Sequence, residues 1–160
     1  MAPRLAAITF AVAAALAFAG GAAAALTLTF GTAPSFNVSL DGTDQTVAFS
    51  FTMTVAGGTN SGWNITASAT QFTASGNTLG YPTVTGVPAG ACTGSSCTNA
   101  VNLSTYPIAL TGTAQKIFSD QAGAGKGSIP LTANMTMAVG GNAFAGAYAS
   151  TLTLTIVSGP

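Results

Sequence analysis

The chain has 160 residues, a formal net charge of zero and no histidine, and charged residues make up 4% of it, against about 25% in an ordinary soluble domain. Hydrophobic residues make up 48% and mean hydropathy is +0.53, which excludes an intrinsically disordered chain, because disorder combines low hydrophobicity with high net charge. The balanced charge excludes electrostatic binding of nucleic acid, and the lack of histidine and glutamate removes the usual groups of acid–base, triad and zinc chemistry.

Residues 1–25 are predicted to be a cleaved secretory signal peptide. Arg4 supplies the positive start, residues 5–18 form an apolar run, and small residues up to Ala25 provide a cleavage site after Ala24 or Ala25. A retained membrane helix is the alternative, but the second half of the run is mostly Ala and Gly, and no charged residue follows to stop it. No later run reaches the ~18 apolar residues that a spanning helix needs. We expect a mature chain of residues 26–160, secreted or at the bacterial cell surface, with no transmembrane anchor.

Beyond the leader the sequence alternates with a period of two residues. Between Thr46 and Val55, Val47, Phe49 and Phe51 share one face with later apolar residues, while Thr, Ser and Ala occupy the other. This pattern is typical of a half-buried antiparallel strand. Similar runs cover residues 26–30, 36–40, 63–69, 84–87, 106–110, 116–119, 129–139 and 148–157. Glycine-rich turn signals separate them, so the mature chain is predicted to be all-β, a single antiparallel β-sandwich of about 8–9 strands.

Cys92 and Cys97 are expected to form a disulfide across a short loop, because an exported chain folds under oxidising conditions. A thiol-redox or metal site is the alternative. Four residues separate the two cysteines, whereas a CxxC motif has two, and the sequence offers no further cysteine or histidine ligand. The loop is therefore expected to be structural, with no bound metal and no cofactor.

Few other residues suggest chemistry. Asp41 and Asp44, with Asp120, have oxygen ligands suited to calcium, but their spacing fits no calcium loop and Asp-Gly is a common turn pair. Residues 123–127 form a glycine-rich turn with no helix after it, unlike a phosphate loop. Either lysine of the mature chain could form an isopeptide bond with an asparagine. No catalytic residue is assigned, and Trp63 is open to two interpretations, core packing or an exposed ligand platform.

Two segments resemble the WxL-domain surface proteins of bacteria. Residues 62–72 begin Gly62-Trp63-Asn64-Ile65 and are similar to the family's first motif, in which a Trp-x-Leu or related triplet opens a strand. Residues 146–160 resemble its closing strand, with Gly146, Tyr148 and an alternating Thr-rich run, and the turn at residues 125–131 is also similar. Leu154-Thr155-Ile156 stands where the family has its second Trp-x-Leu. The resemblance implies a domain that binds the Gram-positive cell wall without covalent attachment.

Two functions follow as expectations. The first is a secreted, non-enzymatic protein that binds cell-wall polysaccharide, including peptidoglycan, or other surface proteins. The resemblance implies a contact surface drawn from the two motif segments: Trp63, Asn64, Ile65, Tyr148, Leu154 and Ile156. The second is a structural subunit of a surface layer or filament, which would self-associate by donating the alternating segment from Leu26 to Phe30 to a neighbour's sheet.

Overall fold

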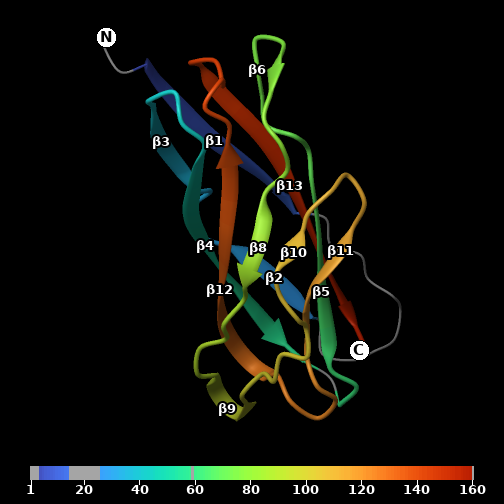
Figure 1. Ribbon diagram of the computed structural model, residues 1–160. Helices are drawn as coiled ribbons and strands as arrows, with labels where there is room; N and C mark the ends of the chain where they lie inside the picture. Colours follow the sequence, from blue (N-terminus) through green and yellow to red (C-terminus); the bar gives the residue numbers. More distant parts are fainter. Residues whose placement is uncertain (1–3, 15–25, 59, 160) are drawn as a thin grey trace.

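The described part of the protein consists of two β-sheets (Figure 1). The structure is a computed structural model. It describes residues 4–14, 26–58 and 60–159, and the side chains of residues 26–58 and 60–159. Sheet A has the order β11 (Gln115–Ser119), β5 (Trp63–Ala69), β13 (Ala147–Ser158), β1 (Arg4–Ala14), β3 (Ser35–Leu40). In addition, β6 (Thr73–Ala74) pairs with β13, and β7 (Asn77–Thr78) pairs with β6. Sheet B has the order β10 (Ile108–Ala109), β8 (Thr83–Gly86), β12 (Lys126–Val139), β4 (Gln45–Gly57), β2 (Thr27–Phe30), with β9 (Thr93–Thr98) beside β12.

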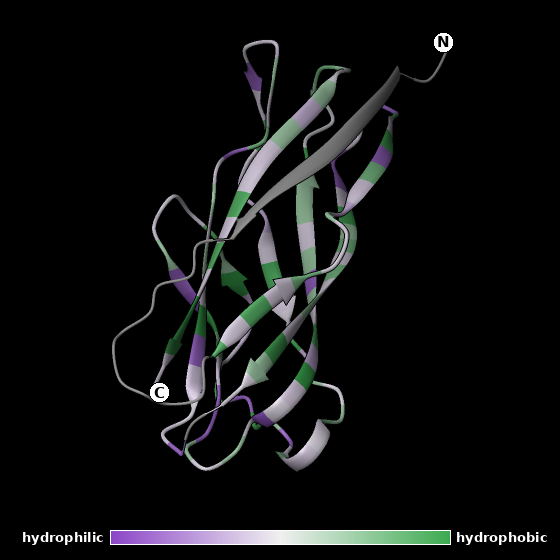
Figure 2. Cartoon of the chain, turned by 180° about the vertical axis from the view of Figure 1, so that it is seen from behind, coloured by the Kyte–Doolittle hydropathy of each residue, from purple (hydrophilic) through white to green (hydrophobic). Residues whose placement is uncertain are grey.

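The period-two alternation fixes which side of each long strand faces the core. Strands β4 and β12 are antiparallel and in register from Gln45↔Val139 to Gly57↔Gly127. Ile129, Leu131 and the other inward residues of β12 are at most 2% exposed, while Thr and Asn at the alternate positions face out. Figure 2 shows the same alternation as bands of contrasting hydropathy along the strands. The inward side chains of both sheets form one continuous core, which confirms the predicted all-β sandwich.

Local pairings add strands that the alternation does not mark. The turn signal at Ser75-Gly76 closes a hairpin, since both residues have positive φ (47° and 84°) and β6 pairs with β7 around them. Such a two-residue turn is typical of a tight hairpin. The predicted run at residues 106–110 is reduced to Ile108–Ala109. The cysteine loop contains a strand, β9, which pairs with β12. In the described part of the chain no helix has the length and apolar character to cross a bilayer.

Strand β1 comes from the predicted signal peptide. It pairs with β13 in parallel, from Ala7↔Ala147 to Ala14↔Leu154, and with β3 in the antiparallel sense, from Arg4↔Leu40 to Thr9↔Ser35. This pairing with β13 is parallel, whereas the described strands of residues 26–160 pair with one another in the antiparallel sense, as predicted. The predicted cleavage site after Ala24 or Ala25 lies outside the described residues, and cleavage stays a prediction.

Candidate functional site

The two segments that resemble WxL motifs are neighbours in the structure. Strand β5 carries the first segment and β13 the second, and they pair antiparallel, with Ile65 opposite Ile156 and Ala67 opposite Leu154. Residues 83 to 95 positions apart in the sequence thus pair in one ladder of sheet A. Because Asn64 lies opposite Val157, the start of the first motif segment and the end of the second lie at the same end of the sandwich.

Trp63 packs inside this end of the sandwich. Its side chain is fully buried and stacks on Phe118 of β11, with ring centroids 4.9 Å apart and an interplanar angle of 9°. The indole Nε1 donates a hydrogen bond of 2.9 Å to the carbonyl oxygen of Gly125. A buried indole needs such a partner, since an unpaired N–H in the core would be costly. Of the two interpretations of Trp63, core packing is therefore the one that the structure shows.

The other predicted contact residues are also buried, which corrects the expectation that they form a binding surface. Ile65, Leu154, Ile156 and Tyr148 are each at most 3% exposed, and the Tyr148 hydroxyl donates to the Phe144 carbonyl at 3.0 Å. Asn64 is 3% exposed, and its Nδ2 donates to the carbonyl oxygen of Gly159. Hydrophobic side chains at alternate positions of central strands face the core, so the motif residues build the sandwich. A ligand would have to meet other side chains.

A buried carboxylate adjoins Trp63, and sequence reasoning did not anticipate it. Asp120 is fully buried; its Oδ1 accepts a hydrogen bond of 2.9 Å from the Val101 N–H, and Oδ2 has no hydrogen-bond partner among the described residues. Burial raises the pKa of this carboxyl above its usual value, against the lowering effect of the Val101 hydrogen bond. Gly125 has a φ of 59°, and a side chain there would collide with the Asp120 carboxylate and the Trp63 indole. Asp120, Gly125 and Trp63 thus pack against one another in the interior of the protein.

The remaining carboxylates hold turns. Asp41 accepts hydrogen bonds at Oδ1 from the N–H and hydroxyl of Thr43, at 2.9 and 2.8 Å, and from Gln45 Nε2 at 2.9 Å. The Thr43 N–H is the main reason that the pKa of Asp41 is lowered. Asp44 accepts from the Gly141 N–H at 2.8 Å, which joins the β3–β4 turn to the turn after β12. Within the described part of the chain, no three His, Cys, Asp or Glu side chains cluster as metal ligands would.

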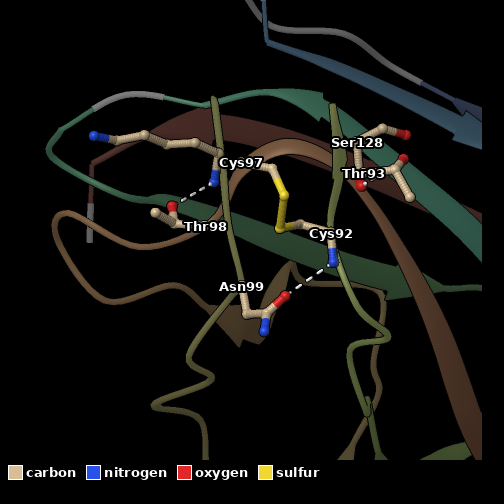
Figure 3. The surroundings of a disulfide bond; sticks show 7 residues. Cys92, Thr93, Cys97, Thr98, Asn99 and Ser128 are labelled. Carbon is tan, nitrogen blue, oxygen red and sulfur yellow. Dashed lines mark hydrogen bonds between the residues drawn. A yellow bond between two sulfur atoms is a disulfide. The ribbon is translucent and has the colours of Figure 1, made fainter. Parts of the chain in front are cut away.

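The predicted disulfide is present. Cys92 and Cys97 are joined with their Cα atoms 5.8 Å apart (Figure 3). The Cys92 N–H donates to Asn99 Oδ1 at 2.9 Å, and the Lys126 N–H donates to Thr98 Oγ1 at 3.2 Å, so the loop is tied at its base and to β12. Gly127 of β12 has a φ of 98° and no room for a Cβ beside Cys97 and Thr93. The lysine next to it donates from Nζ to Asn60 Oδ1 at 2.6 Å, an exposed hydrogen bond. The disulfide loop therefore lies closely against β12.

Uncharged polar side chains gather on the outer side of the middle of sheet B. On β4 and β12 the outward positions pair as Thr52↔Thr132 and Ser50↔Asn134 across the ladder. Thr29 of β2 lies opposite Thr54 and extends the surface at one edge, and Thr83 of β8 lies opposite Thr136 at the other. We call these eight residues the hydroxyl face. All of them are exposed or half-buried, and each offers a hydroxyl or an amide.

The outer side of sheet A is similar but includes a charge. Thr66 lies between Thr155 of β13 and Lys116 of β11, and Lys116 is exposed.

No protein-family model matches the sequence, and no curated protein matches it either.

Proposed function

We propose that the mature chain is a secreted, non-enzymatic protein of the bacterial cell surface that binds cell-wall polysaccharide, including peptidoglycan, without covalent attachment. The observation that carries the proposal is the hydroxyl face, whose eight uncharged polar side chains lie on four neighbouring strands, β2, β4, β12 and β8. The resemblance of the neighbouring strands β5 and β13 to WxL motifs supports the same reading.

The chemistry of the hydroxyl face suits a neutral sugar chain. Thr and Ser hydroxyls both donate and accept hydrogen bonds, as sugar hydroxyls do, and the Asn134 amide adds further donors and an acceptor. The stiff χ1 of threonine keeps these groups ordered before binding, which limits the entropy lost on contact. An extended polysaccharide could lie along the long strands β4 and β12. The aromatic contact expected from the sequence is replaced in this proposal by a contact through hydroxyls, because Trp63 is buried.

Sedimentation with purified bacterial cell walls tests the proposal. The mature chain, residues 26–160, should pellet with walls, and the double variant Thr52→Val and Thr132→Val should bind them more weakly. Valine keeps the shape and the strand preference of threonine but removes the hydroxyl. Two lost hydrogen bonds of about 1 kcal/mol each correspond to at least roughly a tenfold loss of affinity.

A matched pair on the other sheet controls for general effects of the substitution. Thr66→Val with Thr155→Val removes two hydroxyls that also face each other across a ladder, on the outer side of sheet A. This variant should bind walls as the unchanged chain does. Failure of the unchanged mature chain to pellet with walls would refute wall binding, and equal losses in both double variants would refute the assignment to sheet B.

A further inference from the structure

Strand β1 occupies an interior position in sheet A, with a partner on each side. It has eight paired residues against β13 and six against β3. Strand β3 stands at the end of the sheet, and β1 is its one neighbour among the described strands. In Figure 1 the dark blue β1 runs between the teal β3 and the red β13. Completion of sheet A thus depends on a strand from the segment that is predicted to be removed with the leader.

Removal of β1 would leave an open strand position with two free edges. The backbone N–H and C=O groups of β3 and β13 that face β1 would lose their partners, and unpaired strand edges recruit other strands. The two flanking strands carry buried apolar side chains, among them Val38 on β3 and Tyr148 and Leu152 on β13. An incoming strand would therefore gain two hydrogen-bonded ladders and cover core residues at the same time.

The segment that starts the mature chain has the pattern that such a position needs. Leu26, Leu28 and Phe30 alternate with threonines, and the segment carries no charge. In the structure only Thr27–Phe30 is a strand, β2, and it pairs on one side only, with β4 at the edge of sheet B. Transfer into the open position would exchange one short ladder for pairing on both sides.

Chain length favours a donor from a second copy. Residues 31–34 connect β2 to β3 in the same chain and would have to form the turn if the segment folded back beside its own β3. A donor from another copy has no such turn, so Leu26, Leu28 and Phe30 could lie opposite the buried Tyr148, Ser150 and Leu152 of β13, where β1 now places Ile8, Phe10 and Val12. We propose that the mature chain polymerises by inserting its N-terminal segment between β3 and β13 of the next copy.

Donation of this segment would take Thr29 from the hydroxyl face and leave the other seven residues of that face in place. The state of assembly tests the inference separately from wall binding. In light scattering and negative-stain images, residues 26–160 should form linear assemblies with a mass several-fold that of one chain. The uncleaved chain, residues 1–160, holds β1 in the position and should stay monomeric under the same conditions. A monomeric mature chain would overturn the proposal, as would equal assembly of the two chains.

Removal and return of the donor strand give a second test. The mature chain without residues 26–31 should fail to assemble, and a synthetic peptide of residues 26–34 should bind it and raise its Tm. The same peptide with Leu28→Lys should not bind, because a charge would enter the core at that position. Assembly that persists without residues 26–31, or equal binding of both peptides, would overturn the proposal. The comparison of the uncleaved and mature chains remains decisive if the shortened chain does not fold.

Discussion

Asp120 is a carboxylate buried in the core beside Trp63, and it gives the protein a pH-dependent stability. Burial raises the pKa of Asp120 in the folded protein above its usual value of 3.8. A raised pKa means that the folded state binds the proton more tightly than the unfolded state, so Asp120 contributes most to stability below about pH 3.8. This contribution is lost as the pH rises through the folded-state pKa. At neutral pH the buried charge destabilises the fold.

Replacement of this carboxylate by an amide tests the argument. Asp120→Asn should unfold at a higher urea concentration than the unchanged chain at pH 7, and the difference should vanish near pH 3. The urea midpoint at several pH values measures the effect. Asp41→Asn is the control, because Asp41 is exposed and its pKa is lowered, so its effect has the opposite sign. A lower midpoint for Asp120→Asn at pH 7 would mean that the hydrogen bond from Val101 outweighs burial.

Side-chain environments were the least predictable part of the molecule. The sequence left Trp63 between the core and the surface, and the deciding contact, Phe118, lies 55 positions later on a different strand. The alternation of β5 places Trp63 and Ile65 on the same face but does not say which face is covered. The sequence around Asp120 suggests only a calcium ligand, because the burial of this residue depends on the approach of Gly125 and Val101 from two other segments.

The disulfide loop is an element that fastens one end of sheet B. Ring closure by Cys92 and Cys97 spans a sequence separation of 5, and the loop-entropy model gives a short ring about 2 kcal/mol of stabilisation. The double variant Cys92→Ser and Cys97→Ser should therefore lose about 2 kcal/mol of unfolding free energy, measured by urea denaturation. Dithiothreitol should destabilise the unchanged chain by the same amount and leave the variant unaffected. A variant as stable as the oxidised chain would contradict this role.

Elements were predictable where a strand is long and half-buried. The runs that became β4, β12 and β13 alternate over ten or more residues, because one side faces the core and the other faces water. Strand β9 is mostly exposed and so shows no alternation; its pairing with β12 depends on the disulfide and on Gly127. The position of β1 was not predictable, because a strand between β3 and β13 is defined only by the assembled sheet.

At the scale of the whole molecule, low charge sets the response to salt. The mature chain has two lysines and three aspartates, a net charge of about −1, so interactions between exposed charges contribute little to its stability. We expect the Tm of residues 26–160 to change by less than roughly 2 °C between about 50 and 500 mM sodium chloride, a range over which screening becomes strong. Differential scanning calorimetry measures this. A larger shift would show that the few charges are strongly coupled.

The β6–β7 hairpin extends beyond the body of the sandwich (Figure 1). Its tip is the two-residue turn at Ser75 and Gly76, and Thr73↔Ala149 is the one register pairing among the described residues that joins the hairpin to sheet A. A peptide inserted between Ser75 and Gly76 would lengthen this tip without entering a ladder of the sandwich, since exposed hairpin tips tolerate insertions. The hairpin thus makes the chain a scaffold on which an epitope or an affinity tag can be displayed away from both sheet surfaces.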